Sequence, residues 1–197
     1  NGAACYSALV RYHTTLDLNP DDIHKQGIED LEGIHQEMIQ LSERLFSIAE
    51  LPNLFRHLRT DPELRFETEE GVEEKAKSAL ELAKSRMSEA FDPLPQADCE
   101  VRRIPEFEAP YTTIAYYRPS AADGSRPGTY FVNTYAPETR PRFEAEVLAY
   151  HEAIPGHHLQ IALAHELEAT PKFRRVLHMT AFVEGWALYS ERLSDEM

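Results

Sequence analysis

The residues best suited to chemistry are a close group of histidines and one glutamate in the last quarter of the chain. His151 and Glu152 begin the group, and His157 and His158 end it. In the helical motif H-E-x-x-H, two histidines one turn apart share a zinc ion and the glutamate acts as general base. Here the place of the second histidine is taken by Pro155. The group therefore predicts a zinc site whose backbone departs from a regular helix.

A regular helix through this segment would keep its histidines apart. With roughly 3.6 residues per turn, His157 is turned by about 120° from His151, while His158 shares the face of His151 but lies about 10.5 Å further along the axis. Zinc–nitrogen bonds of about 2.1 Å need ligands only a few ångström apart. Pro155 cannot donate to the carbonyl of His151, and Gly156 permits unusual backbone angles. We therefore expect a kink or bulge that returns His157 to the side of His151.

Helices are predicted on both sides of this group. Asn19 and Pro20 have the residue types of a helix N-cap and first helical position, and the apolar residues that follow recur at helical spacing. A second long amphipathic helix is expected to end before Pro93, because proline breaks helices. Helical patterns return after Pro141, and Thr170 precedes a further helix start. The first part of the chain, residues 1–95, is thus expected to be a helical region.

Strands are predicted between these helices. The runs 99–104, 112–117 and 129–135 are rich in β-branched and aromatic residues and are separated by proline and glycine. They predict a small antiparallel sheet. Residues 96–197 are expected to hold this sheet and the metal-site helices, in one continuous domain with residues 1–95. The fold class is therefore α+β, mainly α-helical.

Composition excludes some classes of partner. The 197 residues carry 34 acidic and 20 basic side chains, giving a formal charge of −14, and no basic cluster is present. Such a chain is not expected to bind nucleic acid or an anionic membrane surface. No apolar run approaches the roughly 18 residues that a transmembrane helix needs. Cys5 and Cys99 have neither metal-ligand nor disulfide-framework spacing.

Two strings resemble a known family. Residues 150–160 read YHEAIPGHHLQ and residues 182–193 read FVEGWALYSERL. Both resemble the signature of the bacterial domain-of-unknown-function family 885, as do the shorter stretches 11–15 and 130–134. That family is similar to gluzincin-type zinc metallopeptidases of the thermostable carboxypeptidase and thimet oligopeptidase groups, whose motif reads H-E-F-G-H. Aligning the final Gly-His of that motif with this chain leaves an insertion, which agrees with the expected bulge.

The resemblance implies a zincin-like catalytic core and a role for each site residue. His151 and His157 would hold one zinc ion, Glu184 would be the third protein ligand, and Glu152 would be the general base. His158 stays open as a core residue, as a hydrogen-bond partner of the site, or as the ligand in place of His157. Two histidines and one carboxylate leave a coordination position for water, whose pKa zinc lowers.

Three further residues are candidates for contacts with the site or with substrate. Glu191 lies on the same helical face as Glu184 and is suited to support a ligand or touch substrate. Tyr189 could stand in for the downstream residue that steadies the oxyanion in related peptidases. The stretch 130–134 could be the edge strand on which a peptide substrate pairs, which makes Asn133 a candidate substrate contact.

Two functions are therefore open. The first is a zinc-dependent peptidase in which activated water attacks a peptide carbonyl. The second is an inactive metal-binding or scaffold part that lacks downstream transition-state residues, because members of the resembled family are longer and this chain looks like a part of one. The resemblance favours a periplasmic or exported lipoprotein of a bacterium. The substrate, the metal loaded and the oligomeric state are left open by the sequence.

Overall fold

The computed structural model describes residues 2–121 and 123–197, and the chain divides into two compact units, Asn1–Glu63 and Leu64–Met197. The division falls well before residue 95, where the helical region was expected to end. The reason is that helix α4 (Glu69–Ala90) packs against both α5 and strand β1. It therefore belongs to the unit that contains the sheet and the candidate site.

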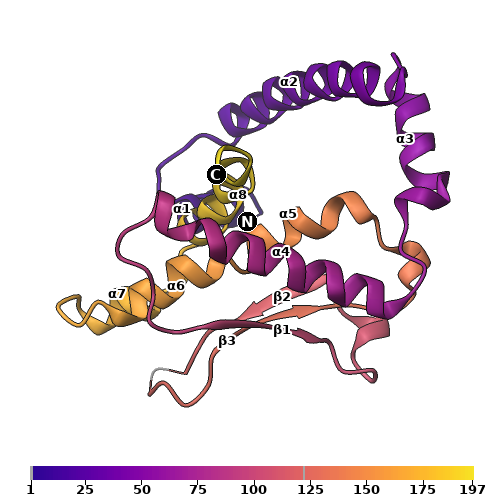
Figure 1. Ribbon diagram of the computed structural model, residues 1–197. Helices are drawn as coiled ribbons and strands as arrows, with labels where there is room; N and C mark the ends of the chain where they lie inside the picture. Colours follow the sequence, from indigo (N-terminus) through magenta and orange to yellow (C-terminus); the bar gives the residue numbers. More distant parts are fainter. Residues whose placement is uncertain (1, 122) are drawn as a thin grey trace. The chain divides into compact units, whose positions relative to one another are not determined.

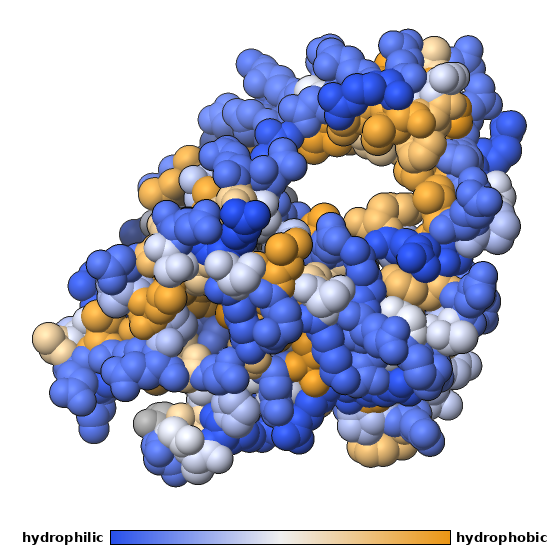
Figure 2. Space-filling model, viewed as in Figure 1, coloured by the Kyte–Doolittle hydropathy of each residue, from blue (hydrophilic) through white to orange (hydrophobic). Residues whose placement is uncertain are grey.

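The first unit consists of three helices: α1 (Gly2–Thr14), α2 (Pro20–Phe46) and α3 (Leu51–Thr60). The predicted start of α2 is confirmed, because Asn19 Oδ1 accepts a hydrogen bond from the backbone N–H of Asp21 at 3.0 Å. The helix ends at Ser47, which adopts a left-handed conformation. Figure 2 shows apolar side chains gathered along one side of α2, where Leu31 and Ile34 are exposed.

The second unit places helices on one face of a small sheet (Figure 1). Its α-helices are α4, α5 (Ala145–Glu152), α6 (His157–Glu166), α7 (Lys172–Val176) and α8 (Thr180–Glu196), its strands are β1 (Cys99–Arg103), β2 (Ala115–Arg118) and β3 (Gly128–Val132), and its 3₁₀ turns are η1 (Pro62–Leu64, which spans the unit boundary), η2 (Ala109–Tyr111), η3 (Pro137–Thr139) and η4 (Arg142–Glu144). Helix α5 contacts α4 on one side and α8 on the other. The predicted α+β class with mainly helical content is thus confirmed.

The sheet differs from the antiparallel sheet that the sequence suggested. The strand order is β1-β3-β2; β3 pairs parallel with β1 and antiparallel with β2. The expectation that residues 130–134 form an edge strand is also wrong, because β3 is the central strand. Alternation of residue types predicts a strand but not its neighbours. The edge nearest the candidate site belongs to β2, which contacts α5.

The core of this unit lies between the sheet and the α4–α5 pair. Ala76 and Ala149 are almost completely buried where the two helices approach, and Tyr130 and Cys99 are buried on the facing strands. Small residues on the helices let the backbones come close, while the larger strand side chains fill the space. Among the described residues, 2–121 and 123–197, no helix is both long and apolar enough to span a membrane.

Candidate metal centre

The chain leaves the helical path between α5 and α6 at the predicted place. Helix α5 ends at Glu152, the turn 153–156 follows, and α6 begins at His157. The backbone N–H of His158 donates to the carbonyl of Ala153 at 2.9 Å, which joins the two helices across the turn. Gly156 is required there, because an added Cβ would lie 1.9 Å from the carbonyl oxygen of His151.

The break brings two histidines and a distant glutamate together. Glu184 Oε2 lies 3.5 Å from His151 Nε2 and 3.7 Å from His157 Nε2. One possible ligand atom from each residue lies within 4.8 Å of the others, and the two imidazole rings are nearly perpendicular, at 83°. Zinc bonds of about 2.0–2.1 Å in a tetrahedron would separate neighbouring ligand atoms by about 3.4 Å. The two nitrogen–oxygen distances are therefore close to the separation of neighbouring ligand atoms in a tetrahedral zinc site.

Glu191 fixes the orientation of the first of these histidines. Its Oε1 lies 2.7 Å from His151 Nδ1, so this nitrogen carries the proton and donates to the carboxylate. The lone pair is then on Nε2, the atom nearest Glu184. A carboxylate behind a ligating histidine is the usual outer partner of a zinc site. Glu191 thus lies where the sequence placed a supporting residue.

Burial favours the neutral form of the second histidine, His157. Desolvation lowers the pKa of His157, with the charge of Glu184 opposing this effect, and His151 and His178 lowering the pKa further. A neutral imidazole has a free lone pair, which metal binding requires. His178 precedes α8 and was not singled out in the sequence as a site residue. It is exposed, and nothing in its local sequence distinguishes it from an ordinary surface histidine.

Glu152, the last residue of α5, is half-buried beside the edge strand β2. Desolvation raises the pKa of its carboxyl; His151 lowers it, Glu184 raises it, and a hydrogen bond from the backbone of Tyr117 lowers it. The carboxylate is therefore held near the cluster by β2 and is more basic than an exposed glutamate. No sequence pattern connects Tyr117 with Glu152, since their contact depends on how the sheet packs on α5.

Three side-chain hydrogen bonds fix α8 against the break. Trp186 Nε1 donates to the carbonyl of Pro155 at 2.8 Å, and Ser190 Oγ donates to the carbonyl of Tyr150 at 3.2 Å. Gln160 Nε2 donates to the carbonyl of Phe182 at 2.9 Å. These contacts hold the helix that carries Glu184 and Glu191 in register with both histidines. Trp186 is thus a supporting residue that spacing alone did not single out.

His158 is a core residue and not an alternative ligand. Its Nε2 donates to the carbonyl of Ala97 at 3.0 Å, and its Nδ1 lies 2.9 Å from the hydroxyl of Tyr117, which donates to it. Both ring nitrogens are therefore occupied by protein atoms. Burial lowers the pKa of His158, which keeps the ring neutral. Gly128 faces the same ring, and a Cβ there would lie 2.5 Å from Nδ1.

The contacts of the other two candidates, Asn133 and Tyr189, do not involve the cluster. Asn133 is buried, donates through Nδ2 to the carbonyls of Ala109 and Thr113, and accepts through Oδ1 from the N–H of Tyr135. Its polar atoms are satisfied within the fold, so the predicted substrate contact is wrong. Tyr189 is 58% exposed and its ring packs beside Trp186. That contact does not direct its hydroxyl to the metal cluster.

Fold and site together define an α+β protein with a cluster of two histidines and one glutamate at a break between helices. The chain belongs to the family described as "Bacterial protein of unknown function (DUF885)", whose model matches residues 1–197. No match was found among curated proteins.

Among solved structures, the chain is similar to the crystal structure of a "putative lipoprotein" from Colwellia psychrerythraea. The TM-score is 0.92 at 28% sequence identity, and the match covers 99% of this chain and 34% of that chain. The 197 residues therefore span about a third of the length of that protein.

Proposed function

We propose that this protein is a zinc-dependent peptidase of the gluzincin type, with a zincin-like core formed by the sheet, α5, α6 and α8. The observation that carries the proposal is the meeting of His151, His157 and Glu184, three residues from separate elements, with Glu191 holding the first histidine in the tautomer that a metal needs. A cluster that served only stability would not need the Nε2 lone pairs of both histidines to point at the same carboxylate oxygen of Glu184.

The donor set fits zinc. Two neutral imidazole nitrogens and one carboxylate oxygen are the protein ligands of catalytic zinc in hydrolases, and they leave one position open. His151 and His157 direct Nε2 towards the same carboxylate oxygen of Glu184. When bound, zinc would act as a Lewis acid that polarises a carbonyl and lowers the pKa of water.

Glu152 is proposed as the general base. Its carboxylate would accept a proton from the attacking water and pass it to the nitrogen of the leaving group. Burial favours the role, because the raised pKa makes the carboxylate a stronger base than an exposed glutamate. The backbone of Tyr117 would orient it during both proton transfers.

The free edge of β2 is the proposed binding place for the peptide backbone. Asn133 N–H donates to the carbonyl of Ile114, and in an antiparallel pair the hydrogen-bonded residues alternate. Tyr116 and Arg118 therefore face β3, while Ala115 and Tyr117 direct their backbone groups outwards. An extended peptide could pair with the backbone of Ala115 there by β-augmentation, next to Glu152, whose carboxylate already accepts a hydrogen bond from the backbone of Tyr117.

Export is part of the same proposal. The structure from Colwellia psychrerythraea is described as a lipoprotein, and this chain matches only part of it. We propose that the longer proteins of the family act outside the bacterial cytoplasm. Their additional residues would supply the parts of the active site that these 197 residues lack.

The proposal is tested by Glu152→Gln, with the exposed Glu168→Gln as matched control. Glu152→Gln should bind one zinc ion per chain, measured by elemental analysis, but lose peptide hydrolysis by a factor of about 100 to 10,000. Glu168→Gln should behave as wild type. Wild-type hydrolysis in Glu152→Gln would exclude Glu152 as the base. A wild-type protein that holds zinc but cleaves no peptide would favour the inactive metal-binding alternative.

A further inference from the structure

The helical unit Asn1–Glu63 has almost no interior of its own. Among its described residues, 2–63, only Ser42 and Leu54 are buried. The hydrophobic core of the chain contains no residue from α1, α2 or α3. Helices in folded proteins are stabilised mainly by packing an apolar face against other elements. The apolar side chains of this unit therefore lack the cover that normally holds such helices in place.

A continuous exposed apolar face lies on α2. It consists of Leu31, Ile34, Met38, Leu41 and Leu45, which we call the α2 seam. Met38 is half-buried, and the other four are between 45% and 62% exposed. These residues follow one another at spacings of three and four, which places them in one row along the helix. Figure 2 shows apolar side chains gathered along this side of α2.

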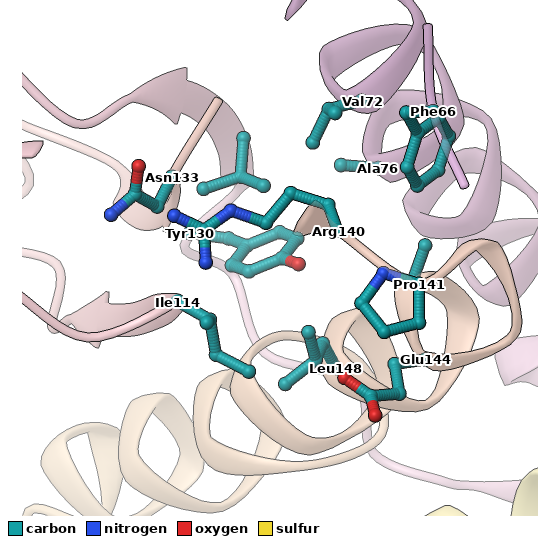
Figure 3. A pocket seen from close by; sticks show the side chains of 12 residues that line it. Phe66, Val72, Ala76, Ile114, Tyr130, Asn133, Arg140, Pro141, Glu144 and Leu148 are labelled. Carbon is teal, nitrogen blue, oxygen red and sulfur yellow. The ribbon is translucent and has the colours of Figure 1, made fainter. Parts of the chain in front are cut away.

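Helix α4 shows how such a face is covered elsewhere in the chain. Its residues Val72 and Ala76 are 4% and 1% exposed. They line a cavity of only about 30 Å³, together with Tyr130 and Leu148 from the facing elements (Figure 3). The apolar face of α4 is thus closely packed, whereas the α2 seam is open. A contiguous exposed apolar surface of this kind marks a place of interaction.

The charges beside the seam indicate which kind of partner fits. Helix α2 carries seven acidic and two basic side chains. With about 100° between successive residues, Asp30 and Glu37 lie in the row directly beside the seam. Glu32 and Glu43 lie beyond its opposite border. The α2 seam is therefore an apolar row with predominantly acidic borders.

These features favour a helix with basic borders. Two helices pack through apolar residues that recur at spacings of three and four, and charges beside the contact select the partner. A second copy of this chain would bring acidic borders together, which like-charge repulsion disfavours. An anionic membrane surface is disfavoured for the same reason.

We propose that the α2 seam binds an amphipathic helix with Lys or Arg along its borders, supplied by the part of the longer family proteins that lies outside this match. The match covers 34% of the protein from Colwellia psychrerythraea, so a chain of that length has further segments to supply the helix. Its apolar residues would cover the seam, and its basic residues would face Asp30 and Glu37. The proposal concerns the unit without metal ligands and does not depend on peptidase activity.

Binding of synthetic peptides to the full 197-residue chain tests this proposal. The probes are overlapping peptides of roughly four heptads. One set tiles the part of the Colwellia psychrerythraea protein outside the match, and another tiles residues 64–197 of this chain. Fluorescence anisotropy measures binding. We expect binding by one peptide, or one overlapping group, from the first set, with apolar residues at helical spacing and Lys or Arg beside them.

Two substitutions in α2 locate the binding surface. Ile34→Asp should weaken binding of that peptide by at least about tenfold, because the contact would bury an unpaired carboxylate. Gln36→Asp adds the same charge on the opposite, exposed face of α2 and should bind as wild type. Circular dichroism checks that both variants stay helical. If Ile34→Asp does not fold, Ile34→Ala should still weaken binding by about fivefold or more, because it removes buried apolar area.

Changing the charge of the bound peptide tests the acidic borders. Replacing its Lys and Arg by Glu should weaken binding by at least about tenfold. Equal binding of the two peptides, binding that survives the substitutions at Ile34, or no binding by any peptide from outside the match would overturn the proposal. Binding only by peptides from residues 64–197 would show that this chain covers its own seam. A dimer in sedimentation equilibrium that Ile34→Asp dissociates would assign the seam to a second copy. Either result would equally overturn the proposal.

Discussion

At the scale of single residues, the candidate centre depends on which nitrogen of each histidine is free. His151 Nδ1 donates to Glu191 at 2.7 Å, so Nε2 is left for a metal. Both ring nitrogens of His158 are hydrogen-bonded to protein atoms, so this residue contributes to the fold rather than to the proposed metal site. Neighbouring histidines in one motif thus have different roles because their hydrogen-bond partners differ.

Replacing Glu191 should weaken zinc binding without removing a ligand. We expect Glu191→Gln to lower zinc affinity by about 10- to 100-fold, since outer carboxylates of this kind orient the ring and make it a better donor. Competition with a chromophoric chelator measures the affinity. Glu196→Gln, an exposed change on the same helix, is the control and should leave affinity unchanged. Equal affinities in the two variants would contradict the role assigned to Glu191.

His158 should make the metal-free protein less stable in acid. Its pKa is lowered by burial from an ordinary value of 6.5, so the unfolded chain binds its proton more readily. The stability from the neutral ring is therefore complete above about pH 6.5 and is lost as pH falls through the lowered pKa. His158→Gln should cost about 1–3 kcal/mol at pH 7.5. It should also flatten the decline between pH 7.5 and 5, measured by urea unfolding.

At the scale of elements, the turn between α5 and α6 decides whether the ligands meet. The turn replaces the helical path that would have kept His151 and His157 apart, and Trp186 ties it to α8 through the carbonyl of Pro155. The helix that supplies Glu184 is thereby fixed to the segment that supplies both histidines. Each ligand is therefore placed by packing rather than by its own helix alone.

Gly156→Ala should disrupt this turn, whereas Gly185→Ala should not. An added methyl at Gly156 would lie 1.9 Å from a backbone oxygen, while Gly185, within α8, has no atom within 4 Å of its ideal Cβ. We expect Gly156→Ala to destabilise the protein by on the order of 3 kcal/mol and to abolish zinc binding. Gly185→Ala should be neutral or stabilise by up to about 1 kcal/mol. Thermal unfolding with elemental analysis compares them. Normal zinc content in Gly156→Ala would refute the requirement for this turn.

At the scale of the whole molecule, the candidate site lies entirely in the unit Leu64–Met197. Its proposed ligands come from three helices, α5, α6 and α8. A ligand that binds only the folded state stabilises it by mass action, by about 4 kcal/mol at a thousand times its dissociation constant. Metal should therefore act as a clamp on these three helices.

Removal of zinc should accordingly lower the stability of one unit selectively. We expect a chelator to lower the melting temperature of zinc-loaded protein and to raise amide hydrogen exchange in α5, α6 and α8. Exchange in α1–α3 should be unaffected, because no proposed ligand lies in the unit Asn1–Glu63. His151→Ala, which should not load zinc, is the control and should not respond to the chelator. A uniform change across both units would argue against the assigned ligands.

Much of the architecture follows from the sequence alone. The cap at Asn19 and the breaking effect of Pro155 are local effects of residue type, and each predicted run overlaps one of the strands. The Pro-Gly pair also indicated that the backbone must leave a regular helix near His157. These features were predictable because each depends on residues a few positions apart.

The tertiary structure alone decided strand order, the identity of the edge strand and the partners of each polar group. Strand β3 is central because it pairs with β2 on one side and with β1, which comes earlier in the chain, on the other. Asn133, which directly follows β3, is therefore buried instead of facing a substrate. Arg140 and Tyr130 share a cavity although sequence separates them from the histidine motif. Contacts between distant segments depend on packing of the whole core, and periodicity in one segment carries no information about its neighbour.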